Sequence, residues 1–235
     1  MDLLPDAVLR YADHDEAVVD VHLPEHTSGA VVVLVHGGFW KAEWDRTHTR
    51  PLARTLADEG FVVASPEYRR VGNGGGWPTT AEDVRRALTA LPDLLGALEV
   101  TSTRTTLVGH SAGGHLVLWL ASEVAVDRVV GLAPVCDVRE AARLGLGANA
   151  TRAFLGGGPE EVDYDPADPM VRLDERPDAD VVIVHGNRDE NVPLDLSRRF
   201  VERHPWVRLV ELGCGHFELI DPDDPAHEAV RAALG

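Results

Sequence analysis

Short apolar runs alternate with longer amphipathic segments along almost the whole chain. The short runs are rich in β-branched residues, which favour strands, and the longer segments repeat apolar residues at the spacing of one helix face. The runs that predict strands are residues 17–23, 30–35, 61–64, 105–109, 128–133, 181–185 and 207–212. The segments that predict helices are residues 47–58, 81–98, 112–124, 194–204 and 225–234. This alternation predicts an α/β fold with a mostly parallel, twisted sheet and helices on both faces.

Two segments depart from this alternation. Residues 17–23 alternate apolar and polar side chains, which is typical of an antiparallel edge strand with one face in water. Residues 137–180 carry glycine-rich turns, several prolines and a helix-like stretch at 138–144. A structureless loop of that length is improbable in a compact domain, so we expect a short helical cap over the carboxyl edge of the sheet. A surface excursion without a role is the alternative.

The composition suits one acidic domain. The chain has 235 residues, 44% of them hydrophobic, and we expect a single domain over residues 1–235 with the cap inserted at about 137–180. The 22 Lys and Arg stand against 39 Asp and Glu, which gives a net charge of −17, and Lys41 is the single lysine. Nucleic acid and anionic membrane surfaces are therefore disfavoured as partners, because both attract basic proteins.

The first residues show no basic stretch followed by an apolar one, and no apolar run approaches the roughly 18 residues of a membrane span. We therefore expect a cytoplasmic protein. Cys136 and Cys214 are the two cysteines, and they fit a reducing compartment in which both thiols stay free. No metal-binding spacing includes them.

A G-x-S-x-G motif, Gly109-His110-Ser111-Ala112-Gly113, stands between a predicted strand and a predicted helix. In that context it predicts a nucleophile elbow, because two glycines let the backbone turn sharply and leave the Ser111 hydroxyl exposed at the sheet edge. The Ala112 N–H then lies at a helix N-terminus, where the dipole and an unpaired donor can stabilise an oxyanion. A merely structural glycine turn is the alternative.

A serine nucleophile needs a base, and the base needs an acid that holds it in one tautomer. His216 follows the last predicted strand on a glycine-flanked loop, which allows it to bend toward the sheet edge. Asp189 follows the predicted strand at 181–185. We therefore predict a catalytic triad in the chain order Ser111, Asp189, His216.

Other residues compete for these roles. Asp137 follows the predicted strand at 128–133 and is the alternative acid, and Glu190 is adjacent to Asp189. We expect His110 to pack or hydrogen-bond locally and His185 to serve the fold of the acid loop.

The loop after the strand at 30–35 reads His36-Gly37-Gly38-Phe39-Trp40. Paired glycines allow backbone N–H groups to point at a substrate carbonyl, so we assign Gly38, Phe39 and Ala112 to the oxyanion hole. We expect His36 to hold this loop by a hydrogen bond. Phe39, Trp40 and Trp44 crowd the loop, which predicts an aromatic wall, and we expect Trp40 and Phe217 to contact the substrate. A tryptophan that anchors the core is the alternative.

Together these motifs resemble the α/β-hydrolase superfamily over nearly the whole chain. The HGG-x-W form resembles the kynurenine formamidase (arylformamidase) and small carboxylesterase branch, since Phe39 stands where hormone-sensitive-lipase-like enzymes carry a third glycine. The segment Ser65-Pro66-Glu67-Tyr68-Arg69 resembles one in those esterases whose Tyr and Arg support the oxyanion loop.

The resemblance implies a serine hydrolase with no metal or organic cofactor that cleaves a small ester or aryl formamide through an acyl-enzyme. The negative charge favours neutral or cationic substrates unless arginines such as Arg69, Arg70 and Arg152 make the pocket positive, and we favour solvated or structural roles for these three. A homodimer is possible. An exopeptidase-like hydrolase and a non-catalytic ligand-binding module on a hydrolase scaffold are the alternatives.

Overall fold

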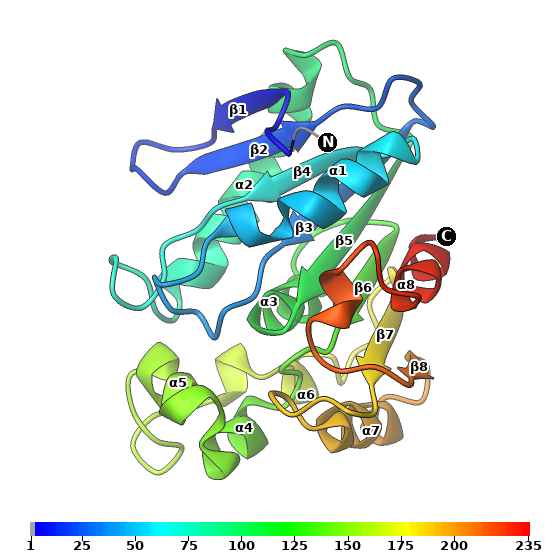
Figure 1. Ribbon diagram of the computed structural model, residues 1–235. Coiled ribbons are helices and arrows are strands. Elements are labelled where there is room, and N and C mark those ends of the chain that lie inside the picture. Colours follow the sequence, from blue (N-terminus) through cyan, green and yellow to red (C-terminus); the bar gives the residue numbers. More distant parts are fainter. Residues whose placement is uncertain (1–2) are drawn as a thin grey trace.

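The computed structural model describes residues 3–235, which form one eight-stranded sheet with helices on both faces (Figure 1). The strand order is β1-β2-β4-β3-β5-β6-β7-β8. The strands are β1 (Ala7–Arg10), β2 (Val18–His22), β3 (Ala30–Val35), β4 (Val62–Pro66), β5 (Arg104–His110), β6 (Arg128–Leu132), β7 (Asp180–Gly186) and β8 (Arg208–Leu212). All neighbouring strands from β4 to β8 are parallel, whereas β1 and β2 are antiparallel to their neighbours. The predicted mostly parallel sheet is therefore confirmed.

Strand β2 differs from the prediction of an edge strand with one face in water. It lies between β1 and β4, and its polar residue Asp20 is fully buried. The Asp20 carboxylate instead forms ion pairs with Arg46, at 2.8 Å, and Arg50, at 2.7 Å. The polar positions of β2 thus face a covering helix that carries arginines, and the shorter strand β1 forms the edge.

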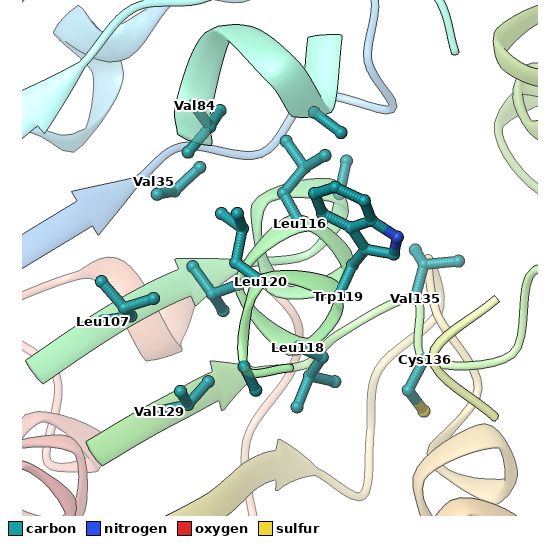
Figure 2. Packing of buried hydrophobic residues seen from close by; sticks show 14 of the residues in the cluster. Val35, Val84, Leu107, Leu116, Leu118, Trp119, Leu120, Val129, Val135 and Cys136 are labelled. Atoms are coloured by element: carbon teal, nitrogen blue, oxygen red, sulfur yellow. The ribbon is translucent and has the colours of Figure 1, made fainter. Parts of the chain in front are cut away.

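The two faces of the sheet carry separate apolar cores. Helices α1 (Arg50–Asp58) and α8 (Ala226–Leu234) contribute Leu52, Leu56 and Val230 to one core. Helices α2 (Thr79–Gly96), α3 (Ala112–Leu120) and α7 (Leu194–Arg203) contribute to the other. Figure 2 shows Leu107 and Val129 of neighbouring strands packed near Leu116, Leu118 and Leu120 of α3. Every residue of α3 is buried, so this helix is enclosed between the central strands and the elements that cover it.

The segment between β6 and β7 is helical. It contains α4 (Val138–Leu144), α5 (Leu146–Leu155), the 3-10 turn η2 (Asp165–Ala167) and α6 (Pro169–Arg172), so the predicted helix at 138–144 is confirmed. This segment packs on the loop that follows β3: the Lys41 ammonium donates to the Gly147 carbonyl at 2.9 Å. It also packs on α3, where Trp119 donates its indole N–H to the Pro166 carbonyl at 2.9 Å.

Two 3-10 turns complete the described elements, η1 (Arg46–Thr49) before α1 and η3 (Glu218–Ile220) before α8. Within residues 3–235, no helix combines the length and the apolar character needed to cross a membrane.

Candidate active site

Ser111 occupies a sharp turn between β5 and α3. Its φ of 55° and ψ of −115° lie in a region that residues with a side chain rarely adopt. The flanking glycines have no room for a side chain, because a Cβ on Gly109 would lie 2.2 Å from the Gly113 carbonyl oxygen. A Cβ on Gly113 would lie 2.2 Å from the Val35 carbonyl oxygen. The strained serine and both close approaches match the geometry predicted for a nucleophile elbow.

A cavity of about 100 Å³ opens above this turn. It is lined by Gly38, Phe39, Trp44, His48, His110, Ser111, Asn191, His216 and Phe217. The fold therefore brings the predicted nucleophile, the predicted base and the predicted oxyanion loop, residues 36–40, to one place from distant parts of the chain. No Asp, Glu, Lys or Arg belongs to the lining, so the walls carry no permanent charge.

The predicted base and acid form a short hydrogen bond. His216 donates its Nδ1 proton to Asp189 Oδ2 at 2.6 Å, and both side chains are almost fully buried. The other carboxylate oxygen accepts the backbone N–H groups of Asn191 and Val192, each at 2.8 Å. Burial alone would raise the pKa of Asp189, but hydrogen bonds from His185 and His216 outweigh it and hold that pKa below its ordinary value. Asp189 is thus held as a carboxylate against the His216 ring.

Within residues 3–235 no hydrogen bond joins the Ser111 hydroxyl to the His216 ring. Both residues line the same cavity. Hydrogen bonds between a nucleophile and its base are often long in the absence of substrate and tighten when it binds, so this geometry is compatible with a catalytic pair.

The competing acids lie elsewhere. Asp137 accepts the Glu140 N–H at 2.8 Å, which caps α4, and pairs with Arg199 at 3.1 Å. Glu190 is exposed and does not line the cavity. Neither carboxylate contacts His216, whereas Asp189 does.

His110 and His185 have the local roles that were predicted for them. The His110 ring donates to the backbone carbonyl of His216 at 3.0 Å, and burial holds its pKa well below the ordinary value. His185 lies under the acid loop, where its Nε2 donates to the Val192 carbonyl at 2.9 Å. Both rings therefore support the loops that carry the acid and the base.

The loop after β3 takes an unusual backbone path. Gly38, Phe39 and Trp40 have φ values of 103°, 51° and 55°, all in the left-handed region. His36 holds this loop as predicted: its Nε2 bonds Glu67 Oε1 at 2.8 Å, and its carbonyl accepts the Tyr68 hydroxyl at 2.7 Å. No acceptor among residues 3–235 takes the backbone N–H of Gly38, Phe39 or Ala112, so these donors are free to bind a ligand.

Glu67 is a supporting residue that the sequence reasoning did not single out. It is buried and also forms an ion pair with Arg70 at 2.8 Å, and Arg70 in turn donates to the Trp44 carbonyl. The resemblance pointed to Tyr68 and Arg69 as supports of the oxyanion loop. Tyr68 is one, but Arg69 binds Asp83 at 2.7 Å instead.

The structure does not bring Trp40 to the cavity, which corrects its prediction as a substrate contact. Its ring is fully buried and stacks on Phe154 with centroids 4.5 Å apart. The left-handed turn at Phe39 and Trp40 points the indole into the core, and no sequence pattern reveals this. Trp44 and Phe217 form the aromatic wall instead: they are 42% and 49% exposed, with ring centroids 6.5 Å apart.

Two cavity residues were missed altogether. Asn191 lies in the acid loop that the sequence had identified, so its position two residues after Asp189 was a usable signal. His48 lies on the turn before α1, where nothing in the local sequence indicates a site.

The three arginines considered as a source of positive charge are all paired outside the cavity. Arg69 binds Asp83, Arg70 binds Glu67, and Arg152 binds Glu160 at 2.8 Å. Their predicted structural roles are confirmed.

Comparisons with known proteins agree with this architecture. Residues 19–129 match the BD-FAE family. The chain is 28% identical to esterase LipC of Mycobacterium tuberculosis over 220 residues, which cover 81% of this chain but 54% of LipC, so it spans about half of that relative's length.

Solved structures share the fold over nearly the whole chain. A candidate thioesterase from a Silicibacter species superposes with a TM-score of 0.78 at 27% identity, covering 97% of this chain and 84% of that one. Esterase B of Lactobacillus rhamnosis superposes with a TM-score of 0.79 at 19% identity, covering 98% and 85%. With its sheet order and the sharp turn at Ser111, the chain has the α/β-hydrolase fold, and its similarity to these esterases agrees with that fold.

Proposed function

We propose that this protein is a serine hydrolase that cleaves a small carboxylic ester or an aryl formamide through an acyl-enzyme. The observation that carries the proposal is the cavity that brings Ser111, His216 and the free N–H groups of the oxyanion loop together, with Asp189 bonded to His216 at 2.6 Å. Esterase LipC, an esterase by name, supports the ester-hydrolase class.

The residues divide the reaction between them. His216 takes the proton of Ser111 as the hydroxyl oxygen attacks the substrate carbonyl, and Asp189 orients the ring and stabilises its positive charge. The carbonyl oxygen becomes an oxyanion that accepts hydrogen bonds from the free backbone N–H groups of the loop at Gly38 and Phe39 and of Ala112. The leaving group departs with the proton from His216, and water then releases the acyl group by the same steps.

The cavity also limits the substrate. A volume of about 100 Å³ leaves room for a short acyl group, and the uncharged lining suits a neutral one. Trp44 and Phe217 at the wall supply apolar surface for the rest of the molecule. These features favour a small acyl ester or a formamide over a long-chain or anionic substrate.

The test is the ratio of kcat/KM for N-formylkynurenine to kcat/KM for p-nitrophenyl acetate, with Ser111→Ala as the blank. A preference of about a hundredfold for the formamide corresponds to about 2.7 kcal/mol of transition-state binding and identifies an arylformamidase. Ester turnover without formamide turnover identifies a carboxylesterase. Equal rates for wild type and Ser111→Ala with both substrates would contradict the proposal and leave a ligand-binding module.

A further inference from the structure

Two further buried polar side chains, His185 and Ser197, extend the chain of polar contacts from Asp189 away from the cavity. His185, at the end of β7, and Ser197, on α7, are both fully buried, and neither lines the cavity. The His185 ring lies directly behind Asp189, with Nε2 3.3 Å from Asp189 Oδ2. This is the same carboxylate oxygen that accepts the His216 proton.

The contacts of His185 determine which ring nitrogen carries its proton. Nε2 faces two acceptors, the Val192 carbonyl at 2.9 Å and Asp189 Oδ2, so it carries the N–H. Nδ1 lies 2.7 Å from the Ser197 hydroxyl, which donates to it in the neutral ring. With the opposite tautomer, Nε2 would present a lone pair to a carbonyl and a carboxylate and repel both.

The same ring also orders the loop that carries the acid. Val192, whose carbonyl accepts from His185, donates its own N–H to Asp189 Oδ1 at 2.8 Å. His185 thus holds Asp189 both directly and through the backbone of residues 189–192.

We propose that His185 and Ser197 are positioning residues of the hydrolase: the Ser197 hydroxyl holds His185 in its Nε2–H tautomer, and that N–H fixes Asp189 against His216. The inference rests on the proposed function, since the base it orients is the one assigned there. Tautomer selection by the partner of the second ring nitrogen is the same principle by which Asp189 acts on His216.

Ser197→Ala is the sharpest test, because it removes one hydroxyl that touches neither the cavity nor Asp189. We expect kcat for p-nitrophenyl acetate to fall about tenfold with KM changed less than about twofold, since only the transition state uses the oriented base. Ser197→Thr keeps the hydroxyl and should restore most of kcat. Ser65→Ala is the matched control, because Ser65 is equally buried and its hydroxyl has no hydrogen-bond partner in the described part of the chain; it should leave kcat unchanged.

Nitrogen-15 NMR of histidine-labelled protein reads the tautomer without turnover. We expect the His185 proton on Nε2 in wild type and a shift toward Nδ1 in Ser197→Ala. A wild-type proton on Nδ1 would overturn the proposal even if the alanine variant does not fold. So would a Ser197→Ala enzyme that keeps wild-type kcat, or one that loses no more than Ser65→Ala.

A failure of the proposed function would give a different set of results from a failure of the positioning role. In that case wild type would not hydrolyse the ester, whereas the His185 tautomer and the Nδ1 proton that His216 donates to Asp189 would still be visible by NMR and would still respond to Ser197→Ala.

Discussion

At the scale of single residues, the candidate site contains backbone in unfavourable conformations, which buried side chains around it hold in place. Ser111, Phe39 and Trp40 all have left-handed backbone, which costs roughly 1–3 kcal/mol each and persists only when the surroundings enforce it. Buried partners such as Glu67 and Tyr68 enforce it around the oxyanion loop.

The candidate residues Ser111, Asp189 and His216 could be predicted from the sequence because each lies in a short motif directly after a strand. Since the carboxyl ends of parallel strands meet at one edge of the sheet, these three residues could be expected to lie at the same edge. The orientation of Trp40 and the presence of His48 could not, because they depend on backbone dihedrals and on the packing of a distant turn.

The aromatic wall leads to a prediction at this scale. Phe217→Ala removes a half-exposed ring from the cavity wall, so we expect KM for p-nitrophenyl acetate to rise about three- to tenfold, with kcat changed much less. Steady-state kinetics measures both. Leu144→Ala, a comparably exposed apolar residue on α4, is the control and should change neither; an unchanged KM in Phe217→Ala would remove this residue from the substrate site.

At the scale of elements, the sheet from β3 to β8 was predictable because each strand contains a short apolar run between segments with helical periodicity. Strand β2 was predicted as an antiparallel strand at residues 17–23, which is confirmed, but its place inside the sheet was not predicted, and β1 was not predicted at all. The buried polar residue Asp20 gives β2 the alternation of a solvated strand, although arginines on the neighbouring turn and helix neutralise it. The four-residue strand β1 is too short to show a period.

The junction between the helical segment 137–180 and the rest of the fold contains a carboxyl group with unusual titration. Burial and the nearby charge of Asp137 raise the pKa of Asp168 to about 7. Its carboxyl accepts the Met170 N–H at 3.1 Å, which caps α6. Because the folded pKa lies above the unfolded value of 3.8, the fold favours the protonated form, and stability is lost as pH rises from about 4 to about 7.

Asp168→Asn should remove this pH dependence while keeping an oxygen to cap the helix. We expect the loss of unfolding free energy between pH 5 and pH 8 to be smaller than in wild type by roughly 2–3 kcal/mol. Urea denaturation at both pH values measures it. Asp178→Asn, an exposed carboxylate with the same charge change, should follow wild type. Parallel pH profiles for Asp168→Asn and wild type would show that Asp168 is an ordinary carboxylate.

At the scale of the whole molecule, the protein has a net charge of −17, whereas the cavity lining contains no Asp, Glu, Lys or Arg. The long-range field repels anions, whereas the lining supplies no cation to hold one. We therefore expect a neutral acetate ester to have a higher kcat/KM than an anionic ester of similar size at low ionic strength.

The dependence of kcat/KM on salt concentration distinguishes the long-range repulsion of anions from contacts inside the cavity. The gap between the two esters should shrink severalfold between about 10 mM and about 500 mM salt, because screening weakens repulsion over distances beyond the Debye length. Measuring kcat/KM for both esters across this range tests it. A gap that does not change with salt would mean that contacts inside the cavity, and not the charge of the whole protein, select the substrate.

The central claim is that Ser111 is a nucleophile activated by His216. Its most direct test is intact-mass measurement after exposure to a fluorophosphonate, followed by peptide mapping, in wild type, Ser111→Ala and His216→Ala. We predict a single adduct on Ser111 in wild type, none in Ser111→Ala, and labelling slower by about a thousandfold or more in His216→Ala. An adduct elsewhere on the chain, or labelling of Ser111 at the same rate without His216, would contradict the assignment.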